Sequence, residues 1–218
     1  CAGMGAQIIL TARNIARLQD TLSDLEGEGH CIIPADLTDA TQRVKLVEQL
    51  PMLHGVVHCA GVGSRVPCKM ITQEDINYVM KPNAEAPMLL QAELLSEKKI
   101  AKQASIVFVA SAAASMPSAG NAVYSASKAA IIAYAKCLAQ ELAPRQIRVN
   151  SISPAMVWTD LALVGATTEQ LAEAEKQYPL KRYGQPQDIA HLAVYMLSDA
   201  SGWMTGSNVQ ITGGTQML

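Results

Sequence analysis

Short, continuously apolar runs alternate along the chain with longer segments that carry helical spacing. The runs are rich in β-branched residues and do not alternate with polar residues, a pattern typical of parallel strands covered on both faces. We therefore expect a doubly wound α/β architecture, a parallel sheet flanked by helices. The predicted strands are residues 7–11, 31–34, 55–58, 105–110, 148–153 and 208–212, and the predicted helices are 14–26, 39–50, 83–98, 122–143 and 186–198.

Length and composition indicate one globular domain over residues 1–218, because 218 residues of which 50% are hydrophobic and 17% charged can bury one sizeable core. Lys and Arg (17) do not exceed Asp and Glu (19), which argues against a nucleic-acid partner. The longest apolar stretches have about ten residues, whereas a helix that spans a bilayer needs ~20, so we expect no membrane span. The cysteines are odd in number (5) and lack metal-ligand spacing, which indicates a cytoplasmic protein without a metal site. We expect these cysteines to lie in the core as small apolar residues.

A Rossmann-type dinucleotide unit begins with a strand, a glycine-rich turn and a helix, and none of these precedes the first predicted strand. Gly3 and Gly5 are not that turn, because they precede a strand instead of following one, and a helix C-cap explains them better. We expect that about 20–30 N-terminal residues of the unit are missing, which would leave a gap with unpaired backbone in the sheet.

Ser111, Tyr124 and Lys128 form the most specific chemical constellation. The serine stands thirteen residues before the tyrosine, and the lysine follows four residues later, on the same helix face. A neighbouring ammonium favours the phenolate and is expected to lower the pKa of Tyr124 toward neutrality. Ser111 follows a predicted strand at the carboxyl edge of the sheet, where open α/β sheets place ligands, so its hydroxyl can bond a substrate carbonyl.

This arrangement resembles the short-chain dehydrogenase/reductase family, and the resemblance covers the whole chain. His58-Cys59-Ala60-Gly61 stands where the family has Asn-Asn-Ala-Gly, Asn83 stands at its active-site asparagine, and Pro154 to Thr159 stands where it has Pro-Gly and then a threonine. Three departures from the family pattern leave every catalytic group in place. They are His58 and Cys59 for two asparagines, Ala155 for glycine, and Pro82, which removes a backbone donor and is expected to hold Lys81 extended.

The resemblance implies four catalytic roles. Tyr124 passes a proton to the carbonyl oxygen, Ser111 orients and polarises that oxygen, and Lys128 holds the nicotinamide ribose and depresses the pKa of Tyr124. Asn83 positions a water that links Lys128 to solvent. Cofactor contacts are implied for Tyr124 and Lys128 and for Cys59, Ala60, Gly61, Pro154, Val157 and Thr159.

Cofactor choice is set where the second strand of such a sheet ends. Ala12 stands where an NAD-selective relative has an aspartate, and Arg13 offers a guanidinium to a 2′-phosphate, which favours NADP(H) over NAD(H). Arg13 as a solvated residue opening a helix is the alternative. Asp36 and Leu37 resemble the adenine contacts of the family, although Asp36 is equally suited to cap a helix.

These observations predict an NADPH-dependent carbonyl reductase, most similar to the 3-oxoacyl-acyl-carrier-protein reductases of fatty acid biosynthesis. Its substrate would be a small ketone or an acyl thioester, with acyl carrier protein as a partner. Residues 88–90 and 129–133 are apolar, and the resemblance implies that the two helices carrying them pair across the interface of a homotetramer or homodimer. Core packing is the alternative explanation of these runs. Two alternatives stay open: an NAD-dependent secondary alcohol dehydrogenase of the same family, and a non-catalytic nucleotide-binding or scaffold member.

Overall fold

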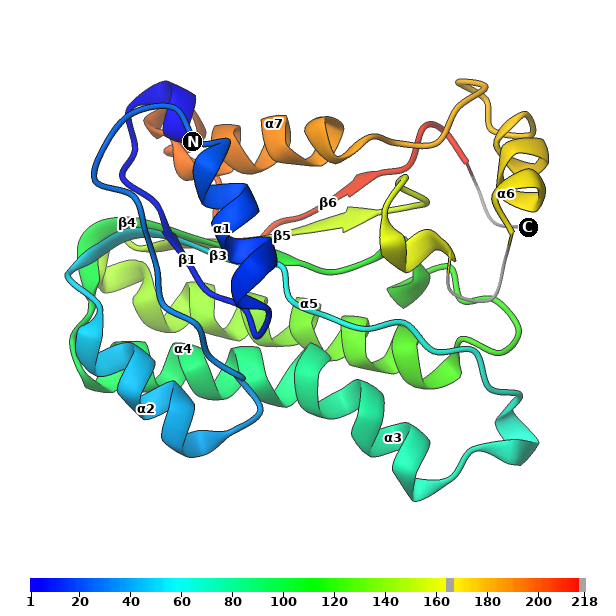
Figure 1. The fold of residues 1–218 in the computed structure, drawn as a ribbon, viewed down its shortest axis with the longest axis horizontal. Coiled ribbons are helices and arrows are strands. Elements are labelled where there is room, and N and C mark those ends of the chain that lie inside the picture. The colour runs from blue at the N-terminus through cyan, green and yellow to red at the C-terminus, as the bar shows by residue number, and fades with distance from the viewer. Residues whose placement is uncertain (164–166, 216–218) are drawn as a thin grey trace.

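The computed structural model describes residues 1–163 and 167–215 and contains a parallel sheet flanked by helices (Figure 1). Strands β3 to β6 are hydrogen-bonded in the order β3-β4-β5-β6, and β1 and β2 form a separate parallel pair. The strands are β1 (Ile9–Leu10), β2 (Cys31–Ile32), β3 (Leu53–His58), β4 (Ile100–Val109), β5 (Arg148–Pro154) and β6 (Asn208–Ile211). All six predicted strands are present, and the predicted α/β architecture is confirmed.

The sheet is covered on both faces, as the continuous apolar runs predict. Ile106 and Phe108 of β4 pack into a core with helices on one side, whereas Val107 between them packs against Met196 on the other. Figure 1 shows α4 and α5 below the sheet and α7 above it. Because successive residues of a strand point to opposite faces, a run of three buried apolar residues requires cover on both faces.

Seven α-helices lie within the residues that the structure describes, and polar side chains cap several of them. Asn14 and Asp39 accept hydrogen bonds from the backbone N–H groups of Arg17 and Gln42, so the predicted cap at Asp39 is confirmed. No helix in the described part of the chain combines the length and apolar character needed to cross a membrane. The helices are α1 (Ile15–Ser23), α2 (Ala40–Gln49), α3 (Gln73–Met80), α4 (Ala86–Ser96), α5 (Ala122–Leu142), α6 (Thr168–Glu175) and α7 (Pro186–Leu197).

Strands β1 and β3 belong to the two different sheets. Each is hydrogen-bonded to a strand on one side only, and Val57 of β3 remains 39% exposed. The start of the described chain is a short 3₁₀ turn, Ala2–Met4, which ends at Gly5 with a left-handed φ of 86°. Gly5 is thus the C-cap that the sequence predicts, because glycine adopts positive φ without steric strain.

The prediction that the cysteines lie in the core is wrong, because all five are exposed. Cys59 directly follows β3, which is hydrogen-bonded to another strand on one side only, and Cys137 lies on α5 outside the buried stripe formed by Ile131, Ala135 and Leu138. Apolar neighbours in the sequence therefore gave a wrong prediction of burial for both residues. Cys59 follows a strand that is paired on one side only, and Cys137 lies on a helix face that points away from the sheet.

Candidate active site

The catalytic residues expected from the sequence meet at the carboxyl ends of β3 and β4. Ser111 follows β4 and begins a 3₁₀ turn, in which its hydroxyl oxygen accepts a hydrogen bond from Ala113 N–H at 3.1 Å. Tyr124 lies in the first turn of α5, near enough to Ser111 for the serine side chain to act on the pKa of its phenol. The helix start thus brings the acid–base candidate to the hydroxyl that would share a carbonyl oxygen with it.

Lys128 lies one turn after Tyr124, and its side chain is buried. Its Nζ donates to the carbonyl of Val109 at 2.9 Å and lies 5.9 Å from the centre of the Tyr124 ring. A methyl group added to Gly61 would lie 3.3 Å from Nζ and 3.1 Å from the Asn83 Oδ1 atom. Glycine is therefore what allows the loop after β3 to approach these two side chains closely.

Asn83 is held in a π-helical turn, Lys81–Glu85, between α3 and α4. Two prolines explain the turn, because Pro82 cannot donate to the carbonyl four residues before it and Pro87 cannot donate to that of Asn83. The Asn83 carbonyl is thereby left without its α-helical donor. The expectation that Lys81 is extended is wrong: its φ of −57° and ψ of −56° are helical, because the wider turn accommodates the following proline.

The side chain of Asn83 is hydrogen-bonded to protein through both its oxygen and its nitrogen. Its Oδ1 accepts from Val62 N–H at 2.7 Å, and its Nδ2 donates to the Val62 carbonyl at 2.9 Å and to Ser127 Oγ at 3.2 Å. Both protons of the Asn83 amide nitrogen are thus donated to protein, so only oxygen atoms of Asn83 are left to accept from a water of the kind that the resemblance implies.

The expected depression of the Tyr124 pKa by Lys128 is not what the structure shows. Burial raises the pKa of Tyr124, and the hydrogen bond with Ser111 opposes this rise. Burial also lowers the pKa of Lys128 to about 8, against the opposing charge interaction with Cys59. The ammonium lies near the phenol ring but is itself desolvated, and desolvation disfavours both charged forms.

Three residues expected to bind the adenosine half of a cofactor lie where β1 and β2 end. Arg13 is exposed and lies before the N-cap of α1, so it does not open that helix. Asp36 does not cap a helix either, because Asp39 caps α2; its Oδ1 accepts from the N–H and hydroxyl of Thr38. These bonds, and more weakly the charge of Arg13, lower the pKa of Asp36. Leu37 packs partly against the core.

His58 and Cys59, the two departures from the family motif, have opposite environments. His58 is buried, stacks on Phe108 with ring centres 4.5 Å apart, and pairs with Gln91 through Nε2 at 3.0 Å. Burial lowers the pKa of His58 to about 4, so the ring is neutral and Nε2–H donates to the amide oxygen. Cys59 is exposed at the open side of β3, yet desolvation of the sulfur raises its thiol pKa.

The segment after β5 carries the remaining expected contacts. Pro154 ends the strand, Val157 forms an isolated parallel bridge with Gly184, and the Thr159 hydroxyl donates to the Val157 carbonyl at 3.3 Å. A cavity of about 160 Å³ lies against Val157, and Met156, Leu180 and Ile211 are among its other lining residues.

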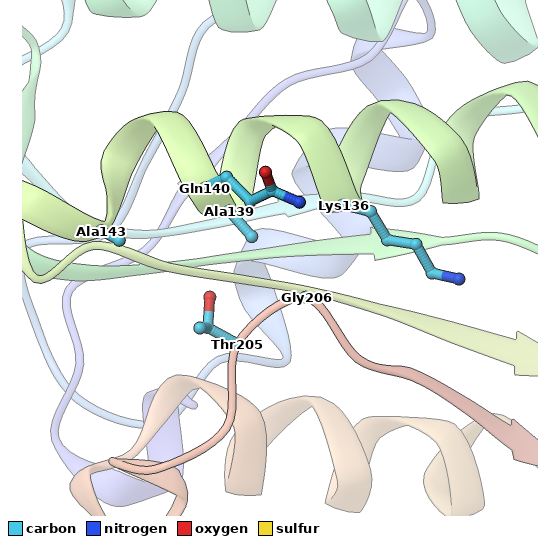
Figure 2. Close-up of a pocket in the computed structure, with 6 residues that line it drawn as sticks. All are labelled: Lys136, Ala139, Gln140, Ala143, Thr205 and Gly206. Carbon is cyan, nitrogen blue, oxygen red and sulfur yellow. The ribbon is translucent and has the colours of Figure 1, made fainter.

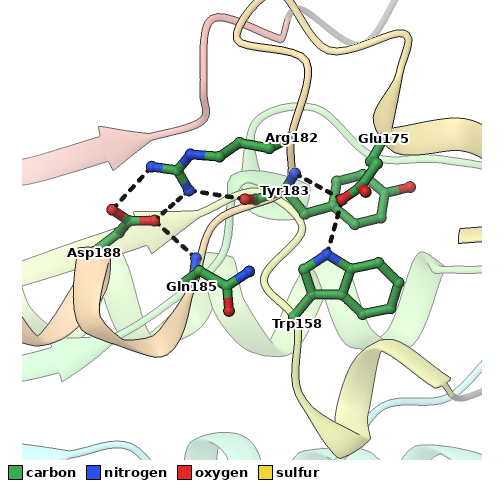
Figure 3. Close-up of polar contacts among 6 residues, drawn as sticks. All are labelled: Trp158, Glu175, Arg182, Tyr183, Gln185 and Asp188. Carbon is green, nitrogen blue, oxygen red and sulfur yellow. Dashed lines mark hydrogen bonds and ion pairs between the residues drawn. The ribbon is translucent and has the colours of Figure 1, made fainter. Parts of the chain in front are cut away.

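Helix α6 is joined to this segment through Trp158 (Figure 3). The Glu175 carboxylate accepts from Trp158 Nε1 at 2.8 Å and from Tyr183 N–H at 3.3 Å. Arg182 then donates to the Tyr183 carbonyl at 2.9 Å and forms two bonds with Asp188, at 2.7 and 3.1 Å. These bonds join Trp158 and the end of α6 to the start of α7.

A larger cavity of about 350 Å³ lies between α5 and the loop before β6, and none of the expected site residues lines it. Figure 2 shows Lys136 and Gln140 at its edge and Thr205 and Gly206 opposite. It lies along the second half of α5, whereas Tyr124 is in the first turn. This cavity is therefore not the candidate active site, although it has the larger volume.

Sequence reasoning missed Gln91, Arg43 and Glu175, which position the expected residues. Gln91 is a polar residue inside the apolar run of α4, and that contrast was a usable signal. The partners of Arg43 and Glu175 lie 50 and 17 residues away in the chain, so no local pattern could identify them.

Comparison with known proteins agrees with this geometry. The sequence profile of a family described as enoyl-(acyl carrier protein) reductase matches residues 1–216. L-xylulose reductase of Caenorhabditis elegans is 33% identical over 98% of this chain and 87% of that protein. The 3-oxoacyl-[acyl-carrier-protein] reductase of Rickettsia conorii is 27% identical over 99% of this chain and 88% of that protein.

A solved structure agrees as well. The short-chain dehydrogenase/reductase, glucose/ribitol dehydrogenase, of Brucella melitensis superposes with a TM-score of 0.91 at 28% identity, covering 100% of this chain and 89% of that one. The chain belongs to the short-chain dehydrogenase/reductase family, whose members are oxidoreductases that bind NAD(H) or NADP(H).

Proposed function

We propose that the protein is an NADPH-dependent carbonyl reductase. The observation that carries this proposal is the convergence of Ser111, Tyr124, Lys128 and Asn83 on one edge of the sheet. The residues around them are suited to a nicotinamide cofactor, because Gly61 leaves space beside Lys128 and the carboxyl ends of β1 and β2 carry Arg13 and Asp36. A non-catalytic scaffold would have no need for the hydroxyl pair of Ser111 and Tyr124.

A bound NADPH supplies a hydride to the carbonyl carbon. As negative charge develops on the carbonyl oxygen, the Ser111 hydroxyl donates a hydrogen bond to that oxygen and the Tyr124 hydroxyl transfers its proton there. The product is a secondary alcohol. The phenolate left on Tyr124 would be stabilised by Ser111 and by the nearby Lys128 ammonium, which would also hold the ribose of the cofactor. A water at the Asn83 carbonyl then returns a proton from solvent.

Cofactor preference in this proposal comes from Arg13. Its exposed guanidinium offers two parallel hydrogen bonds and a full charge to a 2′-phosphate. Ala12 offers no carboxylate to the 2′-hydroxyl of NAD.

The proposed substrate is a 3-oxoacyl thioester or a related ketone, with acyl carrier protein as a partner where the thioester is so attached. The Rickettsia relative carries that name and the Caenorhabditis relative is named for a sugar, so the relatives support a carbonyl substrate more firmly than an acyl one. We place the protein in the cytoplasm as a homodimer or homotetramer, with α4 and α5 at the interface. Leu89, 46% exposed on α4, supports that contact.

The test is NADPH oxidation by the purified protein with a panel of 3-oxoacyl thioesters, ketones and keto sugars, repeated with NADH. Turnover with NADPH at much higher kcat/KM than with NADH supports the proposal. Efficient alcohol oxidation with NAD and weak binding of NADP would instead establish the alcohol dehydrogenase. Cofactor binding without turnover on any carbonyl would contradict the reductase.

A further inference from the structure

The backbone of Asp36 and Leu37 is gripped by two consecutive side chains of α2. Gln42 Oε1 accepts the Asp36 N–H at 2.9 Å, and Arg43 Nη1 donates to the Leu37 carbonyl at 2.9 Å. The segment after β2 is therefore fixed at both a donor and an acceptor by one turn of helix.

Arg43 is in turn held by a third element. Its Nε lies 3.1 Å from Glu93 Oε1 on α4, and the Arg43 side chain is only 6% exposed. Glu93 follows Gln91 by two residues on the helix that begins directly after the π-helical turn of Asn83. Arg43 thus joins the loop after β2 to the helix that leads from the candidate active site.

The geometry of this ion pair contributes little to the stability of the fold but fixes the orientation of the Arg43 side chain. A guanidinium can meet a carboxylate with two parallel bonds, but Arg43 gives Glu93 only Nε and turns Nη1 to the Leu37 carbonyl. Within the described residues, the second oxygen of Glu93 is buried and has no hydrogen-bond partner. A desolvated pair with an unsatisfied oxygen contributes little net stability, whereas it orients whatever else its members bind.

We propose that Arg43, oriented by Glu93 and assisted by Gln42, is a positioning residue that sets the backbone of Asp36 and Leu37 for the adenosine half of the cofactor. The inference rests on the proposed function, because it takes this segment as the adenine contact. Arg43 would then control the affinity of NADP(H) while leaving hydride and proton transfer unchanged.

The experiment compares Arg43→Met, which keeps the length of the stem and removes the guanidinium, with wild type. Binding of adenosine 2′,5′-bisphosphate, of reduced nicotinamide mononucleotide and of NADPH is measured by calorimetry, and kcat is measured at saturating NADPH. Arg43→Met is expected to weaken the binding of the bisphosphate and of NADPH by about tenfold, the scale of one charged hydrogen bond. Mononucleotide affinity and kcat stay within about twofold of wild type, well below that scale.

Arg148→Met is the matched control. Arg148 also donates to backbone carbonyls, those of Met196 and Ser198, but it does so at the far end of α7. Arg148→Met should lower the midpoint temperature of unfolding without changing the affinity for adenosine 2′,5′-bisphosphate relative to that for the mononucleotide. Glu93→Gln and Gln42→Ala are milder changes at the same site and replace Arg43→Met if that variant does not fold. Both are expected to weaken binding of the bisphosphate and to leave binding of the mononucleotide unchanged.

Wild-type affinity for the bisphosphate in all the folded variants would overturn the inference, as would equal loss of both fragments. Wild-type protein that binds no adenosine fragment overturns the inference and the proposed function together. Wild-type protein that binds the bisphosphate but reduces no carbonyl contradicts the proposed function alone.

Discussion

The side-chain amide of Asn83 is hydrogen-bonded to both backbone groups of Val62, accepting at 2.7 Å and donating at 2.9 Å. This pairing joins the π-helical turn to the loop that follows β3, and so holds Gly61 against the Lys128 ammonium. Together with the bond to Ser127 it uses both protons of the Asn83 amide, so Asn83 can serve a bound water only as an acceptor. An amide side chain matches both groups of a peptide unit, which aspartate could not do when ionised.

Gly61→Ala tests this close approach. The added methyl group would lie 3.1 Å from Asn83 Oδ1 and 3.3 Å from Lys128 Nζ, so the loop or both side chains must shift. We expect kcat/KM to fall by about 10²-fold, because small displacements of positioned groups have effects of this size. Steady-state kinetics beside a thermal melt measures it, and wild-type kcat/KM would show that the loop is free to move.

Arg13→Ala is expected to weaken NADPH by about 1.5–3 kcal/mol, the scale of a hydrogen bond to a charged group. NADH, which lacks the 2′-phosphate, should bind almost unchanged. Arg17→Ala is the matched control, since Arg17 is an exposed arginine of α1 paired with Asp160 at 3.2 Å. Fluorescence titration measures both cofactors, and equal losses for the two would show that Arg13 has a structural role only.

His58 predicts a dependence of stability on pH. The unfolded chain protonates this imidazole near its ordinary pKa of 6.5, whereas in the folded protein the pKa is about 4. Between these pH values the unfolded state holds more protons, so the free energy of unfolding falls as the pH falls from 6.5 to 4, by on the order of 3 kcal/mol.

Urea unfolding at pH 7 and pH 5 measures this loss. His58→Asn should be less stable at pH 7, because the stack on Phe108 is lost, but it should lose less stability on acidification than wild type. His54→Asn, at an exposed position of β3, is the control and should keep the wild-type slope. An unchanged slope in His58→Asn would refute the assignment.

Glu175→Ala is expected to raise the KM of the carbonyl substrate by about tenfold, equivalent to about 1.4 kcal/mol. The carboxylate joins α6 to Trp158 (Figure 3), and Trp158 adjoins Val157 in the wall of the cavity of about 160 Å³, so that loss of the carboxylate would loosen this wall. Glu175→Gln keeps an acceptor oxygen and should stay near wild type. Because Trp203 is fully exposed, a Trp203→Phe background makes the emission of Trp158 report the change. An unshifted emission with unchanged KM would count against this role of Glu175.

Local signals in the sequence predicted the sheet and pointed to Ser111, Tyr124 and Lys128 as candidate site residues, whose roles stay predictions. Buried strands such as β4 are continuously apolar, and the spacing of Tyr124 and Lys128 fixes their common helix face. The same reasoning could not give the π-helical turn at Asn83, because it depends on how two prolines are accommodated between packed helices.

Electrostatic expectations failed where they depended on burial. Proximity to Lys128 predicted a lowered pKa for Tyr124, but burial of the phenol dominates and raises it. Burial follows from tertiary packing, which also left Cys59 and Cys137 exposed against expectation. Helices α3 and α6 were not predicted, since both are short and their first turns are polar.

Tyr124→Phe tests the central claim most directly, by measuring carbonyl reduction at saturating NADPH together with NADPH affinity. The proposed mechanism predicts a loss of kcat on the order of 10²–10⁴-fold, the usual contribution of a general acid. NADPH affinity should stay within a few-fold. Tyr134→Phe, on the same helix with its hydroxyl 3.4 Å from the Met88 carbonyl, should keep wild-type kcat. Full turnover in Tyr124→Phe would contradict the account.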